Sequence, residues 1–245
     1  MNTSTKHEYL YHLDLKGQEV LDLGCGDASY WLDILKLYPS MKLHLFEPDQ
    51  KVMAKAKQTL EGTNVVFSTD LKSFFGKKFD FITCFAVLEH VFNLDSFVEN
   101  VALLLKDDGR AYINYDDGHF RRSMYQSRTS LFRFRNNLKT RLALLWKILR
   151  WYSKYQRPVN ASKLEKIIKN HGLEVISQSY HSFDSVEVIS GIIDSKSLEK
   201  IYPLVLKMEG ILNASLPKEP EAKLKGHGQP FLIFSSRTVV LKHNH

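Results

Sequence analysis

The 245-residue sequence lacks the features that mark membrane-spanning and disulfide-rich proteins. It contains no run of 18 uncharged apolar residues, so no transmembrane helix is predicted. Its first eight residues lack the apolar core of a secretory signal. With only two cysteines, Cys25 and Cys84, a disulfide framework is not expected. We therefore expect a cytoplasmic protein, with peripheral contact to the inner face of a membrane as an open alternative.

Acidic residues are absent from residues 118–158, although 27 occur elsewhere in the chain. This segment holds 11 of the 34 lysines and arginines, which leaves 23 basic against 27 acidic residues outside it, a net charge of −4. The overall charge of +7 therefore belongs to one segment. Apolar side chains recur in it at helical spacing, which favours a cap helix with solvated charges. Capture of an anionic acceptor, contact of residues 121–157 with an anionic membrane, and binding of nucleic acid are the alternatives.

Strand and helix patterns alternate along most of the remaining chain. The expected strands cover residues 18–23, 41–46, 64–68, 79–85, 110–115, 174–180 and 231–241. Helical patterns follow the first, second and fourth strands, Asp107–Gly109 is a predicted turn before the fifth, and Ser162 is a predicted helix cap. This alternation predicts an α/β fold, a doubly wound and mostly parallel seven-stranded sheet that helices cover on both faces.

Residues 19–31 form a strand pattern that runs through a glycine turn into a helix pattern. Gly24 and Gly26 allow the backbone to approach a ligand where a Cβ atom would intrude. The helix that follows offers free N–H groups and the positive end of its dipole. The stretch therefore predicts a site for an anionic or nucleotide-like ligand. Ser29 stands where the turns of nicotinamide and flavin proteins carry a third glycine, which argues against those cofactors.

Further residues follow the glycine turn in a fixed order. Glu47 ends the second strand, Asp70 follows the third, Phe79-Asp80 opens the fourth, and the Val87–Val91 stretch comes next. The series resembles the class I S-adenosylmethionine-dependent methyltransferases, particularly the branch that acts on small molecules and lipids. The resemblance is close over residues 15–117 and looser over 160–182 and 230–241. Ala28 stands where that family often has glycine.

The resemblance implies S-adenosylmethionine as the cofactor, bound at the ends of the first four strands. Glu47 would accept hydrogen bonds from both ribose hydroxyls, Asp70 from the adenine amine, and Leu71 would cover the adenine ring. Asp22 would orient the turn or bind the ammonium group through water, and Phe85 would approach the methionine portion or form a wall. The predicted cofactor-binding residues are Asp22, Gly24, Cys25, Gly26, Glu47, Pro48, Asp70, Leu71 and Phe85.

A hydroxyl acceptor needs a general base, which must project from the carboxyl ends of the later strands. His119, just after the fifth strand, and His90 are the candidates. The alternatives are a loop histidine for His119 and a packing residue at a helix start for His90. The predicted substrate-binding residues are Tyr115, Asp116, Arg121, Arg122 and Tyr125. No metal is predicted, because no histidine pair has ligand spacing and the fourth strand ends without a carboxylate.

We therefore expect residues 1–245 to form one domain that methylates a small-molecule or lipid-like acceptor. In one alternative this acceptor is anionic. Methylation is expected at oxygen rather than at nitrogen. Two other functions stay open: an RNA methyltransferase that uses the arginine-rich segment, and a non-catalytic adapter. No stable protein partner is implied. The expected layout is a cofactor-binding core at 14–117, a basic helical cap insertion at 118–158, sheet-completing elements at 159–182 and 230–242, and a second helical insertion at 183–229.

Overall fold

The computed structural model describes residues 10–11, 13–116, 159–183 and 234–244, together with the isolated positions 200, 203, 204, 207 and 211. The first predicted insertion, 118–158, lies outside these ranges. So does the second, 183–229, apart from residue 183 and the isolated positions. The helices predicted for the two insertions are therefore not part of the fold as described below.

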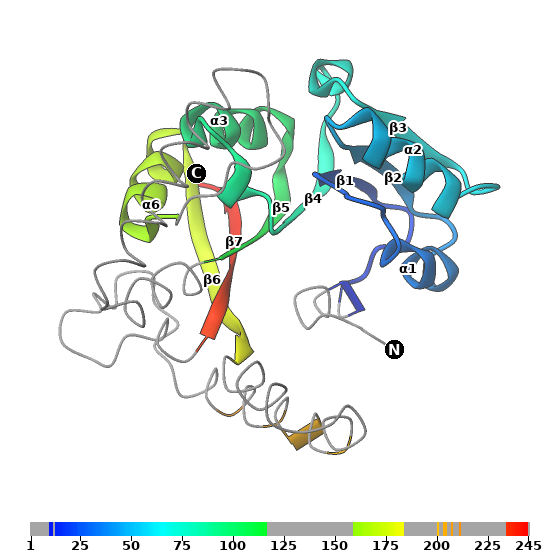
Figure 1. Cartoon of the computed structure of the whole chain (residues 1–245). Coiled ribbons are helices and arrows are strands. Elements are labelled where there is room, and N and C mark those ends of the chain that lie inside the picture. The colour runs from blue at the N-terminus through cyan, green and yellow to red at the C-terminus, as the bar shows by residue number, and fades with distance from the viewer. Residues whose placement is uncertain are drawn as a thin grey trace, which may run out of the picture.

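Seven strands form one sheet in the order β3-β2-β1-β4-β5-β7-β6 (Figure 1). The strands are β1 (Glu19–Leu23), β2 (Lys42–Phe46), β3 (Val65–Ser68), β4 (Phe79–Phe85), β5 (Leu105–Asp116), β6 (Leu173–Phe183) and β7 (Phe234–His243). Neighbours among β1 to β5 run parallel, and β7 runs antiparallel to both β5 and β6. This confirms the predicted mostly parallel, seven-stranded α/β fold.

Helices cover both faces of the sheet. They are α1 (Trp31–Leu37), α2 (Gln50–Thr59), α3 (Leu94–Leu104) and α6 (Ala161–Asn170), with short 3-10 turns η2 (Leu71–Phe74) and η3 (Leu88–His90). Along β1, Val20 lies in the core cluster of α1 and α2, whereas Leu21 lies in the cluster of α3 and α6. Successive strand residues face opposite sides, so this alternation makes the sheet doubly wound. No helix among the described residues is long and apolar enough to span a bilayer.

The start of α6 differs from the prediction. Ser162 is not the cap; the side chain of Asn160 accepts a hydrogen bond from the backbone N–H of Lys163 at 3.0 Å. Val159 before the cap and Leu164 in the first turns are both 1% exposed and belong to one core cluster. A pair of apolar residues at these two positions fixes where a helix begins, so packing selects Asn160 as the cap.

The predicted turn at Asp107–Gly109 is also wrong, because these residues lie within β5. The register shifts there: Phe79 of β4 pairs with Leu105, whereas Phe81 pairs with Arg110. A Cβ atom on Gly109 would lie 2.9 Å from the carbonyl oxygen of Phe79. Glycine is therefore needed for the close approach of two strands, and the extra residues form a bulge.

Candidate active site

The turn after β1 is held against the ends of two neighbouring strands. The backbone N–H groups of Gly24 and Cys25 donate to the carbonyl of Phe46 at the end of β2, at 2.8 and 3.1 Å. Gly24 has φ of +81°, and a Cβ atom there would lie 2.4 Å from Cγ2 of Val87, which follows β4. The absence of a side chain at position 24 therefore lets the ends of β1, β2 and β4 meet.

Gly26 and Glu47 form the open side of this turn. Gly26 has φ of +59°, and a Cβ atom there would meet no atom of the described residues within 4 Å. Its N–H donates to Oε2 of Glu47 at 3.2 Å, and the N–H of Asp49 donates to Oε1 at 3.1 Å. Each carboxylate oxygen can accept a further hydrogen bond. Two backbone N–H groups thus hold the Glu47 carboxylate in place. Its oxygens can still accept hydrogen bonds from a ligand in the open space beside Gly26.

Asp22 lies beneath the turn and is fully buried. Its Oδ1 accepts from the hydroxyl of Thr83 on β4 at 2.7 Å, and its Oδ2 accepts from Nε1 of Trp31 at 3.0 Å and from the hydroxyl of Tyr30. Burial raises the pKa of Asp22, and these three hydrogen bonds oppose the rise. The carboxylate therefore ties β1 to β4 and to the start of α1.

Tyr30 is a residue of this site that the sequence did not single out. Its half-buried ring meets the ring of Phe85 edge-on, with 5.8 Å between centroids, and Phe85 is 6% exposed at the end of β4. Two aromatic rings therefore stand next to the glycine turn. The available signal was a hydroxyl-bearing aromatic residue placed directly between the glycine turn and an apolar helix.

Both cysteine thiols near this edge are buried and free. Burial raises the pKa of Cys25, and the carboxylates of Asp22 and Glu47 raise it further. Burial likewise raises the pKa of Cys84 well above its ordinary value. Because only a thiolate is a good nucleophile, neither side chain is suited to covalent catalysis.

The ends of β2 and β3 carry the remaining predicted cofactor residues. Asp70, which is exposed, caps η2 by accepting from the N–H of Lys72 at 3.0 Å. Leu71 follows it and is half-buried, and Pro48 is exposed beside Glu47. Because the carboxyl ends of parallel strands meet at one edge of a sheet, the structure brings the glycine turn and all of these residues to that edge.

The residues predicted for catalysis and substrate binding are only partly described. His90 is exposed on η3 at this edge, and Tyr115 is 1% exposed in the core cluster of α3 and α6. The backbone of Asp116 pairs with Ser236 of β7. The other predicted residues, His119, Arg121, Arg122 and Tyr125, lie outside the described residues. Within the described ranges, no group of three or more His, Cys, Asp or Glu side chains could hold a metal ion.

The chain matches a family model and is similar to a curated relative. The family model described as "Methyltransferase domain" matches residues 4–178. The ubiquinone biosynthesis O-methyltransferase of Glaesserella parasuis serovar 5 (strain SH0165) is 31% identical over 108 residues. That match covers 41% of this chain and 46% of the relative, so the chain spans less than half the length of this curated relative.

Solved structures share the fold at low identity. The O-methyltransferase from a trans-AT PKS multienzyme of Brevibacillus brevis, in complex with S-adenosyl-L-homocysteine, has a TM-score of 0.56 and 15% identity. The match covers 99% of this chain and 73% of that one. The cyclopropane synthase MmaA2 from Mycobacterium tuberculosis has a TM-score of 0.59 and 15% identity, over 97% of this chain and 82% of that one.

The family match covers most of the chain, and the solved methyltransferase structure shares its fold. The chain therefore belongs to the methyltransferase domain family.

Proposed function

We propose that the chain transfers the methyl group of S-adenosylmethionine to an oxygen atom of a small-molecule or lipid-like acceptor. The observation that carries this proposal is the 31% identity over 108 residues to a ubiquinone biosynthesis O-methyltransferase. The solved O-methyltransferases of similar fold are consistent with the proposal but too distant in sequence to carry it. The described edge of the sheet then has to supply cofactor binding, alignment and a dry surface.

On the cofactor side, Glu47 is the proposed partner of the two ribose hydroxyls. Its carboxylate is held by the N–H groups of Gly26 and Asp49 and has acceptor capacity left, which supports a bidentate contact. Asp70 and Leu71 are the proposed adenine contacts. The side chain of Asp70 already accepts one N–H, so its second oxygen is the candidate for the adenine amine.

For Asp22 the three hydrogen bonds support a positioning role over contact with the ammonium group. Its oxygens already accept from Thr83, Trp31 and Tyr30, and the side chain is fully buried. When bound, S-adenosylmethionine supplies a sulfonium methyl that is already activated for in-line displacement. Tyr30 and Phe85 are the proposed aromatic wall on the methionine side, where they would exclude water and face a cation.

On the acceptor side, His119 is the proposed general base and His90 the alternative. A neutral imidazole can take a proton from a hydroxyl group within hydrogen-bond reach. Tyr115, Asp116, Arg121, Arg122 and Tyr125 are the proposed substrate contacts. We propose that residues 1–245 form one domain, in which the insertions 118–158 and 183–229 cap the 14–117 core.

The test is to incubate the purified chain with methyl-labelled cofactor and a host extract divided into lipid, small-molecule and RNA fractions. We expect label in the lipid or small-molecule fraction, on oxygen by mass spectrometry and NMR of the product. A Glu47→Ala variant, which lacks the proposed ribose contact, serves as the control and should transfer little label. Label confined to RNA would replace the proposal with an RNA methyltransferase. Cofactor binding without labelling of any fraction would favour an adapter.

A further inference from the structure

The amino edge of the sheet, opposite the candidate active site, carries an open pocket of about 460 Å³. A volume of this size is typical of small-molecule sites. Basic side chains from separate segments meet in it: one from β2, two from the residues just before β4, and one from β5. The charged and ionisable residues that line the pocket are Glu19, Lys42, His44, Lys77, Lys78 and Lys106.

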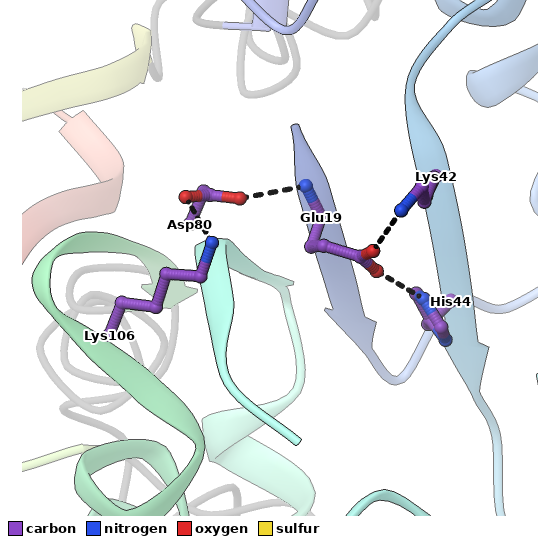
Figure 2. Close-up of polar contacts among 5 residues, drawn as sticks. All are labelled: Glu19, Lys42, His44, Asp80 and Lys106. Atoms are coloured by element: carbon purple, nitrogen blue, oxygen red, sulfur yellow. Dashed lines mark hydrogen bonds and ion pairs between the residues drawn. The ribbon is translucent and has the colours of Figure 1, made fainter. Parts of the chain in front are cut away.

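Two carboxylates hold part of this lining in place, as Figure 2 shows. Glu19 accepts from Nζ of Lys42 at 2.8 Å and lies 2.9 Å from Nε2 of His44. Asp80 accepts from Nζ of Lys106 at 2.7 Å and from the backbone N–H of Glu19 at 2.9 Å. Each ammonium group has three N–H donors and uses one here. The lysines are thus oriented by the protein and still have donors to offer.

The lining has more positive than negative charge. Four lysines face two carboxylates, which leaves an excess of two positive charges when His44 is neutral. Lys77 and Lys78 have no carboxylate partner within the described part of the chain, and Lys78 donates only to the carbonyl of Leu105, at 3.0 Å. Partly exposed ion pairs contribute little by themselves, so their ammonium groups can be shared with a ligand. The excess matches one dianion.

His44 adds a second observation at the wall of this pocket. Its side chain is 5% exposed, and its ring stands edge-on to Phe74 and Phe79, with centroids 5.8 and 5.1 Å away. Nδ1 is buried and has no hydrogen-bond partner among the described residues. Buried polar atoms are usually paired. Nδ1 is shielded from the pocket, so His44 takes part in the lining through Nε2, which lies against Glu19.

We propose that the amino-edge pocket binds a phosphate-class dianion, at a site separate from the edge that binds the methyl donor. Lysine is a common phosphate ligand because it presents a compact positive charge with several donors. A phosphate monoester has a charge close to −2 at neutral pH, which matches the excess in the pocket. The phosphate group can belong to a small metabolite or to a lipid headgroup, and the experiment below separates these sources. The proposal does not depend on the identity of the methyl acceptor.

The test uses inorganic pyrophosphate as the probe, titrated into the full chain by calorimetry at low salt. The pocket variant is Lys77→Gln/Lys78→Gln, chosen because neither lysine is paired with a carboxylate. The control is Lys55→Gln/Lys57→Gln, which removes two exposed lysines of α2 outside the pocket. We expect the pocket variant to bind pyrophosphate about tenfold more weakly. The control should bind pyrophosphate within about twofold of the unmodified chain, because Lys55 and Lys57 lie outside the pocket. The basic 118–158 segment is present in all three proteins, so its contribution to binding cancels in the comparison.

The affinity for S-adenosylmethionine is measured for the same three proteins and should be the same in all of them. An unchanged affinity shows that the pocket variant is folded. A parallel arm measures co-sedimentation with phosphatidylcholine vesicles with and without phosphatidic acid. Loss of either pyrophosphate or vesicle binding in the pocket variant alone supports the proposal, and the arm that responds identifies the source of the phosphate. The proposal is overturned if the unmodified chain binds neither probe. It is also overturned if both variants lose binding equally, since that indicates nonspecific attraction.

Discussion

Replacing Gly24 by alanine tests how the glycine turn is built. The new Cβ atom would lie 2.4 Å from Cγ2 of Val87, 3.2 Å from its Cγ1 and 3.4 Å from its Cβ. Two carbon atoms in favourable contact are about 3.5 to 4.0 Å apart. The first distance falls short of that by more than 1 Å. Rotation of the Val87 side chain can move Cγ2 away, while its Cβ stays in ordinary contact at 3.4 Å, so either Val87 leaves its packed rotamer or the two backbone segments shift.

The expected cost has two parts. A φ of +81° disfavours any residue with a Cβ atom, by about 1–2 kcal/mol for alanine. Overpacking against Val87 adds about 1–3 kcal/mol. Together they lower the free energy of unfolding by about 2–5 kcal/mol, a large fraction of the roughly 5–15 kcal/mol of an ordinary domain. Urea unfolding followed by tryptophan fluorescence and circular dichroism measures this loss.

A double variant separates the two parts. Val87→Ala removes both Cγ atoms, so in the Gly24→Ala/Val87→Ala protein only the backbone strain and the small cavity remain. We expect the double variant to be more stable than the sum of the single changes by about 1–3 kcal/mol, the size of the relieved overlap. Strict additivity of the two single changes would refute the overlap as the reason for glycine at this position.

Gly26→Ala provides the contrast within the same turn. Ala28 already adopts φ of +56°, so this turn tolerates an alanine with positive φ, and the described residues leave open space around position 26. The stability loss should be only about 1 kcal/mol. Affinity for S-adenosylmethionine should fall roughly tenfold to hundredfold, because the methyl group would occupy ligand space. A large stability loss with unchanged affinity would contradict this reading of the turn.

Three further predictions concern single side chains. Glu47→Gln should weaken S-adenosylmethionine binding by about 1.5–3 kcal/mol in calorimetry, the value of a charge-assisted hydrogen bond, and unchanged affinity would exclude the ribose contact. Tyr30→Phe should cost about 1.5–3 kcal/mol of unfolding free energy, because its hydroxyl donates to a buried carboxylate. Tyr38→Phe is the matched control at about 0.5–1.5 kcal/mol, because that hydroxyl donates to a neutral carbonyl; equal losses would contradict the reasoning. Burial lowers the pKa of His44 below its ordinary 6.5, so the unfolded chain binds a proton more readily and stability falls as the pH drops below about 6.5. His44→Gln should flatten that fall in thermal unfolding between pH 6.5 and 5, and an identical pH profile would count against it.

The sheet could be predicted from the sequence because its strands are short apolar runs bounded by polar or glycine residues. β4 has the predicted bounds of 79–85, and β1, β2 and β3 each begin one residue later than predicted. A parallel strand that is buried on both faces produces such an apolar run, because the side chains on both faces must be apolar. Asp49 caps α2, and a cap of this kind can be predicted from local sequence because it depends on backbone N–H groups two and three residues away.

The features that the sequence did not predict depend on distant segments. Gly109 belongs to a bulge because β4 passes close to it, 30 residues earlier in the chain, although its neighbours resemble a turn. Thr83 reaches Asp22 across 61 residues, and nothing in its apolar strand indicates a hydrogen bond to a buried carboxylate. Asn160 and Ser162 are equally good caps locally, and only the packing of Val159 and Leu164 distinguishes them.

Strand β1 joins the two edges of the sheet at which we propose ligand sites. Glu19 lies at its amino end and the glycine turn follows its carboxyl end, so the edges are separated by roughly 17 Å, the rise of five extended residues. This separation exceeds the Debye length of about 8 Å at physiological salt, so exposed charges at the two edges are largely screened from each other. Within β1, Val20 to Leu23 are buried and Asp22 is fixed by three hydrogen bonds. Coupling between two sites needs an element with two arrangements, and a strand packed in this way is not expected to switch when a ligand binds at one edge. Pyrophosphate at the amino edge should therefore leave the affinity for S-adenosylmethionine within about twofold, and a larger change would require that β1 or its neighbours move.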